Sequence, residues 1–299
     1  MKLPITLLFL ITLLSCNTNK NHIYIDEDYN AKFEKNKTER AEYRFNYLQL
    51  TGLFKLNAET NTFGKDSIND FVLNIESLPS TIGTISVFED SLVFSASENV
   101  IVKNSRDSII TNYHLKLNEN GSSIKLYHKQ LNWQVITRSK HHYLRVWDTK
   151  NPAIEAFKGF EQFKLNPEFI FEGEFTYYNK VKTEEVHSQL GVNTNTNFIG
   201  KVTFKYNDET HDLDVGESGF TMVSDRTTGD ETYGGGRYIY LALPETNGLV
   251  ILDFNYLWNP PCAFSEFTTC LYPPRQNALP FKILAGEKID LNIKTTNLN

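Results

Sequence analysis

Residues 169–177 read FIFEGEFTY and residues 198–206 read FIGKVTFKY, and these two stretches decide the fold. Large apolar residues recur at every second position, separated mostly by charged or small residues. Side chains of a strand point alternately to its two faces, so this period of two predicts half-buried antiparallel strands. We therefore predict a mainly β protein of antiparallel sandwich-like or barrel-like units.

The rest of the chain after Tyr47 fits the same class. Turn-forming pairs recur at 118–121, 207–208 and 246–248, and no helical segments occur between them that could connect parallel strands. One helix is expected, over 26–45, because this charged stretch contains no Gly or Pro and places several apolar side chains loosely on one face.

The first fifteen residues have the features of a bacterial export signal. Met1 and Lys2 give a positively charged start, and 3–14 is an apolar run. A membrane-spanning helix needs about 20 such residues, so this run is too short to span. It ends in Leu-Leu-Ser-Cys, the pattern that precedes an acylated lipoprotein cysteine. We expect a signal peptide at 1–15 and a palmitate-type lipid on Cys16; a short buried helix in a cytosolic protein is the alternative.

This start also predicts the location and the domain order. A polar tether is expected at 16–25, a helix plus an N-terminal β unit at 26–150, and a C-terminal β unit at 151–299. The expected location is the bacterial cell envelope, with a lipid anchor in the membrane; in a Gram-negative cell the outer membrane is favoured over the inner. The net charge of −6 and the absence of a basic cluster argue against nucleic-acid binding.

The unusual chemistry lies between residues 225 and 287. Residues 249–252 are apolar on both faces and predict a central strand that Asp253 and Asn255 continue on one face. A carboxylate entering such a strand is costly unless it is paired, and Arg237 is the nearest strong candidate in sequence. Asp253 and Arg237 therefore form either a structural pair or the floor of a ligand pocket. A glycine run at 234–236 precedes an apparent strand, which favours a hairpin turn over a phosphate-binding loop.

Cys262 and Cys270 are the two cysteines left after Cys16. An even pair in an oxidising compartment usually forms a disulfide, and seven intervening residues suit the closure of a loop. The alternative is a redox-active or nucleophilic cysteine, which would need a free thiol of low pKa.

The C-terminal segment resembles an uncharacterised bacterial and archaeal family labelled domain of unknown function 1684. The resembling residues include Asp225, Arg237, Asp253-Phe254-Asn255, Asn259-Pro260-Pro261-Cys262-Ala263-Phe264, Cys270, Asn277 and Ala285-Gly286-Glu287-Lys288. An N-terminal signature extends the resemblance back to about residue 38. Tyr256 and Ala278 stand where the family usually has arginine, and the loss of these two cations argues against an anion-binding role in this chain.

The sequence leaves open whether the protein is an enzyme. The favoured interpretation is an envelope lipoprotein that binds a small molecule or an envelope partner through its C-terminal β unit. The candidate binding residues are Arg237, Asp253, Asn255, Asn277 and Glu287. One alternative is a hydrolase in which Asp253 or Glu287 acts as a general acid or base, and another is a structural module. No cofactor and no metal are expected.

Overall fold

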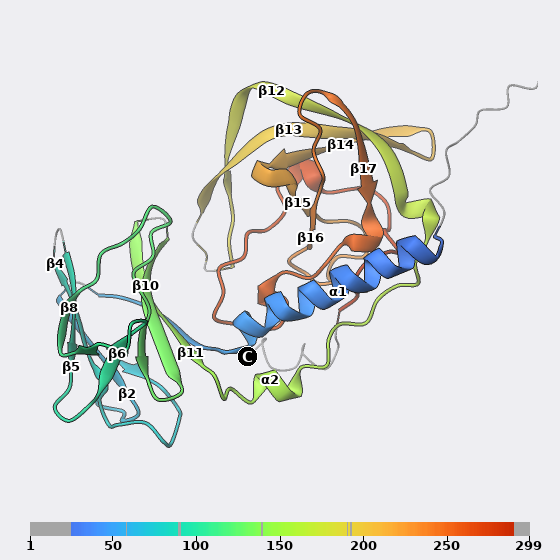
Figure 1. Cartoon of the computed structure of the whole chain (residues 1–299). Helices are drawn as coiled ribbons and strands as arrows, with labels where there is room; N and C mark the ends of the chain where they lie inside the picture. Colours follow the sequence, from blue (N-terminus) through green and yellow to red (C-terminus); the bar gives the residue numbers. More distant parts are fainter. Residues whose placement is uncertain are drawn as a thin grey trace, which may run out of the picture.

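Antiparallel strands make up most of the fold, as the alternating stretches predict (Figure 1). The computed structural model describes residues 25–289 except 58, 89, 90, 139, 190 and 192. The predicted signal peptide 1–15, the lipid-attachment residue Cys16 and nearly all of the tether 16–25 lie outside the described residues. Within the described part, no helix has both the length and the apolar character needed to cross a membrane.

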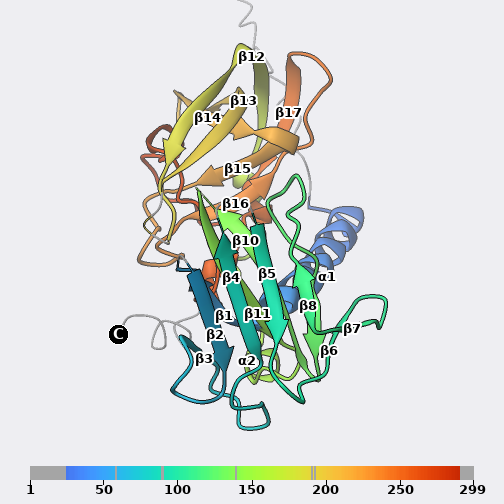
Figure 2. The ribbon, with the colours of Figure 1, turned by 90° about the vertical axis from the view of Figure 1, so that its left-hand side faces the viewer.

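The N-terminal strands form two sheets that pack face to face (Figure 2). Phe63 and Phe94 from one sheet place their rings 5.3 and 5.6 Å from Trp133 of the other, inside one buried apolar core. This is the sandwich that the sequence predicts. All pairs are antiparallel except β2 with β3. One sheet has the order β1-β11-β10-β9-β6-β7, and the other has the order β3-β2-β4-β5-β8.

The elements of this N-terminal part are β1 (Leu50–Lys55), β2 (Glu59–Gly64), β3 (Phe71–Val72), β4 (Gly83–Phe88), β5 (Ser91–Ala96), β6 (Val102–Asn104), β7 (Ile109–Ile110), β8 (Asn112–His114), β9 (Leu126–His128), β10 (Leu131–Arg138) and β11 (His141–Asp148).

The C-terminal strands form a four-stranded sheet, in the order β14-β13-β12-β17, and a separate pair, β15 with β16. The two stretches that decided the fold class lie at the centre of the larger sheet, paired antiparallel with each other. Phe175 on one strand and Val202 on the next are fully buried in a second core that also contains apolar residues of β15 and β16. The alternation therefore separates a core face from an outer face, as predicted.

The elements of this part are a short helix α2 (Ala153–Ala156), β12 (Ile170–Val186), β13 (Thr194–Tyr206), β14 (Glu209–Gly216), β15 (Phe220–Val223), β16 (Arg237–Tyr240) and β17 (Gly248–Asp253). Five 3₁₀ turns complete it, at Pro167–Phe169, Glu217–Gly219, Phe254–Tyr256, Pro261–Ala263 and Arg275–Asn277.

The predicted helix is α1 (Glu27–Leu48), and its first turn is capped as helices usually are. The Asp26 carboxylate accepts a hydrogen bond from the Tyr29 amide at 2.8 Å, which satisfies one free N–H of the first turn. Chain order groups this helix with the N-terminal strands. Its aromatic and ionic contacts instead reach the C-terminal unit, where Phe33 packs against Tyr256 and Arg44 pairs with Glu287. Figure 1 shows it lying along that unit.

Strand β17 differs from its predicted place. It is the edge of its sheet rather than a central strand, and the side chains of Leu249 and Ile251 are 65% and 41% exposed. Only Val250 and Leu252 face the core. The apolar residues on both faces of β17 therefore do not indicate burial on two sides, because the outer face of this strand is uncovered.

Candidate functional site

The predicted pair between Arg237 and Asp253 does not form. Arg237 is 1% exposed, and its Nη2 lies 2.9 Å from Asp225 Oδ2 instead. Its guanidinium also donates to the carbonyl groups of Ile283, Ala285 and Glu287. The prediction was wrong because it paired Arg237 with the carboxylate at the end of the apolar strand. The true partner, Asp225, precedes the glycine turn at 234–236, and this turn brings Asp225 back beside Arg237.

Asp253 ends β17 and caps the 3₁₀ turn that follows, so Asn255 does not continue the strand. Asp253 Oδ1 accepts from the backbone and side-chain amides of Asn255, at 3.0 and 2.9 Å, and Oδ2 accepts from the Tyr29 hydroxyl at 2.7 Å. Burial raises the pKa of the Asp253 carboxyl, and the hydrogen bonds from Tyr29 and Asn255 oppose that rise only in part. Asp253 thus joins α1 to the end of β17.

Glu287 is buried beneath α1 in a second link of the same kind. Arg44 Nη2 lies 2.5 and 2.7 Å from its two carboxylate oxygens, and the Asn259 amide donates to Oε2 at 2.7 Å. The preceding Gly286 has φ +76°, and a Cβ there would lie 2.6 Å from the Leu257 Cβ. Only glycine fits this position, and its turn directs Glu287 towards the helix.

Asn277 and Asn255, the two candidate amides, are both buried and satisfied by the protein itself. Asn277 accepts from the Asp214 amide and donates to the carbonyl groups of Asp214 and Met222. Asn255 exchanges two hydrogen bonds with the backbone of Asn166. These side chains hold loops to strands and leave no group directed towards solvent.

Cys262 and Cys270 form the predicted disulfide, with Cα atoms 6.0 Å apart. The bond removes the free thiol that a redox-active or nucleophilic role would need. It closes the proline-rich loop against Trp258 and Tyr238 in a small apolar cluster.

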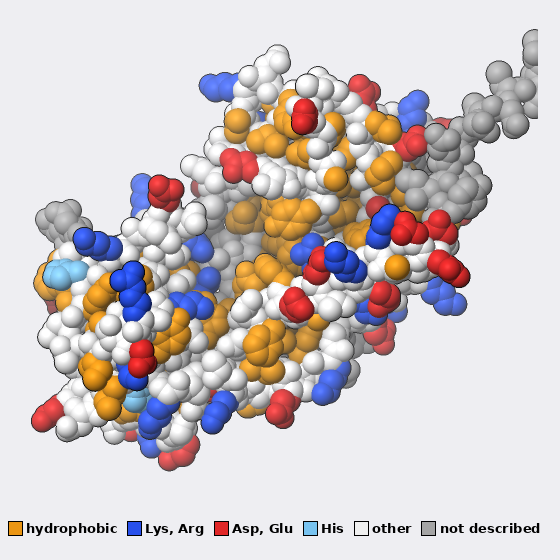
Figure 3. Space-filling view, in the orientation of Figure 1, with side chains coloured by type: hydrophobic (Ala, Val, Ile, Leu, Met, Phe, Trp, Pro, Cys, Tyr) orange, Lys and Arg blue, Asp and Glu red, His pale blue; other side chains and the backbone are white. Residues whose placement is uncertain are grey.

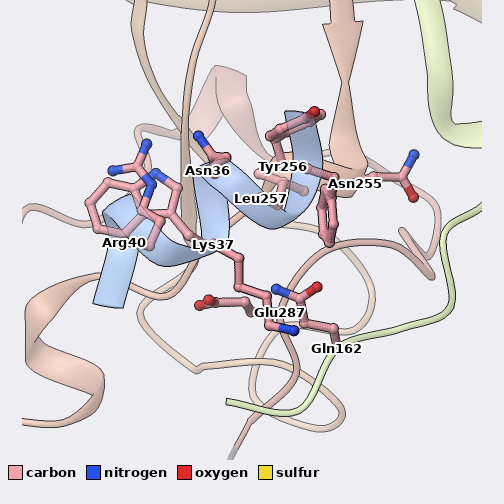
Figure 4. A pocket seen from close by; sticks show the side chains of 10 residues that line it. Asn36, Lys37, Arg40, Gln162, Asn255, Tyr256, Leu257 and Glu287 are labelled. Atoms are coloured by element: carbon pink, nitrogen blue, oxygen red, sulfur yellow. The ribbon is translucent and has the colours of Figure 1, made fainter. Parts of the chain in front are cut away.

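A small cavity lies between α1 and the C-terminal unit, beside their direct contacts (Figure 4). In the view, Gln162 and Glu287 lie below the helix, and Asn255, Tyr256 and Leu257 lie beside it. Its enclosed volume is about 10 Å³, about the room that one water molecule needs. Glu287 and Asn255 therefore meet at this cavity, but it is too small for an organic ligand.

The open surface beside this cavity is the better candidate. The Arg40 guanidinium lies 4.3 Å from the Trp258 ring and 5.7 Å from the Tyr240 ring. Tyr43, one turn along the helix, packs edge-on against Trp258. We call Arg40, Tyr43, Tyr240 and Trp258 the Arg40 surface. Figure 3 shows hydrophobic and basic side chains meeting in the hollow above α1.

Arg40 has no acidic partner on this surface. In the part of the chain that the structure describes, no carboxylate lies within ion-pair distance of it, whereas Arg44 and Arg237 each have one. Burial lowers the pKa of Arg40, so its charge is only partly hydrated. Tyr240 beside it is 51% exposed. The surface can therefore bind an anion and stack against a planar or apolar group.

Sequence reasoning missed all four residues of the Arg40 surface. The signal was present in α1, where Arg40, Tyr43, Arg44 and Tyr47 follow the spacing of one helical face. A search for apolar periodicity passes over a face built of arginine and tyrosine. Among the described residues no three His, Cys, Asp or Glu side chains are grouped as a metal site would require.

Comparison with known proteins supports the family resemblance. Residues 155–288 match the model of the family described as Protein of unknown function (DUF1684). The chain is also similar to the solution NMR structure of an uncharacterized protein from Haloarcula marismortui, with 28% identity and a TM-score of 0.39. That similarity covers 46% of this chain and 80% of the other. No curated protein matches significantly.

Proposed function

We propose that this protein is a lipid-anchored protein of the bacterial cell envelope that binds an anionic ligand at the Arg40 surface of its C-terminal unit. The observation that carries the ligand class is the Arg40 guanidinium itself, stacked on two aromatic rings and without a carboxylate partner among the described residues. Support for the anchor comes from the pattern of residues 1–16.

The chemistry of the surface favours an anion with an apolar or planar part. The hydration that Arg40 has lost by burial is compensated by two aromatic rings and by the charge of Glu287 at longer range, but not by an ion pair. An anion would supply that ion pair, and Arg can present two parallel N–H groups to a carboxylate or phosphate. Tyr240 is half-exposed and offers ring area for the rest of such a ligand, whereas Trp258 is buried beneath Arg40.

The hydrolase alternative has less support from the geometry. Both oxygens of Glu287 accept hydrogen bonds from Arg44, and Asp253 has donors on both of its oxygens. A general acid or base needs a free oxygen within reach of substrate. A purely structural module would explain these pairs but not the unpaired Arg40.

Native mass spectrometry of the protein purified from its own envelope tests the proposal. The wild type should carry a non-covalent adduct that Arg40→Gln loses. The matched control is Lys35→Gln, which removes a charge from the same helix where the lysine side chain is 78% exposed and pairs only with a neighbouring glutamate. The control should keep the adduct. An adduct retained by Arg40→Gln, or none on the wild type, would overturn the proposal.

A further inference from the structure

A second group of cations lies on the N-terminal unit, on the face of the β10–β11 sheet that points away from its sandwich partner and that also contains the buried Ile136, Tyr143 and Trp147. Arg145 pairs with Gln134 in the β-ladder, and Arg138 pairs with His141. Paired residues in a ladder point to the same face, and His141 and Arg145 are four residues apart on one strand. Both arginines therefore stand on one face, opposite the core that contains Trp133 and Leu144.

Lys125 joins the two arginines. Its Nζ lies 4.1 Å from the centre of the Trp147 ring, which belongs to the same face as Arg145. The positive charges of Arg145 and Lys125 act on each other, and Arg138 acts on Arg145. We call Lys125, Arg138 and Arg145 the Arg145 cluster.

None of these three cations has an acidic partner within ion-pair distance in the described ranges of the chain. The Arg145 Nε is buried and has no hydrogen-bond acceptor. Arg138 donates through Nη1 to the carbonyl of Thr137, a neutral group of its own strand. Burial, and then the charge of Arg138, lower the pKa of Arg145 to about 10.

Such an arrangement costs free energy in the protein alone. Like charges repel, and a buried donor without an acceptor loses its hydration without replacement. Arg44 and Arg237 also have a buried Nε without an acceptor, but their charges are compensated by Glu287 and Asp225. A ligand that brings negative charge and several acceptor oxygens would remove both penalties of the Arg145 cluster.

We infer that the Arg145 cluster is a binding site for a phosphate group. Phosphate offers several acceptor oxygens and up to two negative charges, which suits three cations on one face better than a single carboxylate does. The phosphate belongs either to a soluble phosphate ester or to an anionic phospholipid headgroup. The recognising chemistry is the same for both.

This site is distinct from the Arg40 surface, although Tyr47 near the end of α1 links the two. Tyr47 acts electrostatically on Arg138 and Arg145, and its hydroxyl lies 3.0 Å from that of Tyr43. Tyr43 in turn contacts Trp258 of the Arg40 surface. Basic side chains of the N-terminal unit border the same hollow in Figure 3. The inference rests on the unpaired cations of the N-terminal sheet and stands or falls independently of the proposed function.

Titration calorimetry on the full mature chain with Cys16→Ala, which carries no lipid and needs no detergent, tests the site. The probes are inorganic pyrophosphate and glycerol 3-phosphate, and vesicles of phosphatidylglycerol with phosphatidylcholine vesicles as the neutral reference. Arg145→Gln should weaken binding of the preferred probe at least tenfold. Lys103→Gln is the control, because Lys103 is an exposed cation of the same unit and already pairs with Asp107. It should bind as the wild type does.

The melting temperature gives a second readout that does not depend on the probe. Without ligand, Arg145→Gln should melt at the same temperature as the wild type or higher, because it removes an unpaired cation. Binding of the soluble probes alone assigns a soluble phosphate ester, and binding of phosphatidylglycerol vesicles alone assigns a lipid headgroup. The inference is overturned if no probe binds the wild type, or if Arg145→Gln binds equally well.

Discussion

Arg237 and Asp225 are both almost fully buried, and they hold the glycine turn against the segment 283–287. Removing one member of such a pair leaves a buried charge without compensation, which typically costs about 3–5 kcal/mol. Asp225 also accepts from Thr227 and Ile283, so its replacement disturbs more than one contact. Asp225 and Arg237, which belong to the family signature, therefore act by stabilising the fold.

We predict that Asp225→Asn and Arg237→Met each lower the free energy of unfolding by about 3–5 kcal/mol. The double variant should lose clearly less stability than the sum of the two single losses, because each substitution removes the same ion pair. Urea unfolding of the four proteins measures the coupling. The matched cycle of Asp253→Asn with Arg237→Met should be additive within about 0.5 kcal/mol. Coupling in the second cycle and none in the first would contradict the observed pairing.

Asp253 gives a pH-dependent prediction. Its pKa is raised by burial, so the folded protein binds the proton more strongly than the unfolded chain. Its contribution to stability is complete below the ordinary pKa of about 3.9 and is lost as the pH rises through the raised value. Asp253→Asn imitates the protonated form, so the variant should be as stable as the wild type at pH 7 or more stable.

The difference between the two proteins isolates this one group, because all other groups titrate in both. As the pH falls from 7 towards 4, the wild type should gain stability relative to Asp253→Asn. Thermal unfolding at several pH values measures the difference. A difference that stays constant with pH, or that grows in the variant's favour on acidification, would refute the raised pKa.

At the scale of elements, α1 is fixed to the C-terminal unit by a few strong contacts. Arg44→Met should leave Glu287 buried and unpaired, and so weaken docking of the helix by up to about 3–5 kcal/mol. We predict faster hydrogen exchange throughout α1, with unchanged exchange in β10 and β11. Lys35→Met is the control, since it removes only an exposed ion pair worth less than about 1 kcal/mol. Equal exchange in both variants would show that the ion pair does not hold the helix.

The elements were predictable to the extent that their patterns are local. Alternation located β12 and β13, and the charged run from residue 26 located α1, because both periods depend only on neighbouring residues. The position of β17 at an edge depends on which strands cover it, and an apolar run does not encode that. The partner of Arg237 was missed for the same reason: the geometry of the glycine turn determines which carboxylate lies beside Arg237, and the local sequence does not encode that geometry.

The candidate site was predictable in part. The sequence singled out Arg237, Asp253, Asn255, Asn277 and Glu287 as candidates, but it did not show that each of them has partners within the protein. The Arg40 surface combines residues of α1 with residues about 200 positions later in the chain. No local pattern joins such distant segments, so only the fold reveals that Arg40 lies on Trp258 and lacks a carboxylate.

At the scale of the whole molecule, the two proposed sites are linked through Tyr47 of α1, which acts electrostatically on Arg138 and Arg145 and whose hydroxyl lies 3.0 Å from that of Tyr43. In the proposal, the mature chain begins at Cys16, and fewer than a dozen residues separate the lipid from α1. An extended chain spans at most about 3.3–3.6 Å per residue. The tether would therefore keep the start of α1 within a few tens of ångströms of the membrane, where envelope anions are available.

The anchor itself gives the last prediction, since the position of both sites depends on it. Each buried methylene of an acyl chain contributes about 0.8 kcal/mol to membrane binding, so several chains on one cysteine hold a protein almost permanently. Cys16→Ala should abolish incorporation of radiolabelled palmitate and release the protein from the membrane fraction. Cys262→Ala is the control: it removes a cysteine of the disulfide and should leave labelling intact. Persistent palmitate labelling of Cys16→Ala would show that the protein is not a lipoprotein anchored at that residue.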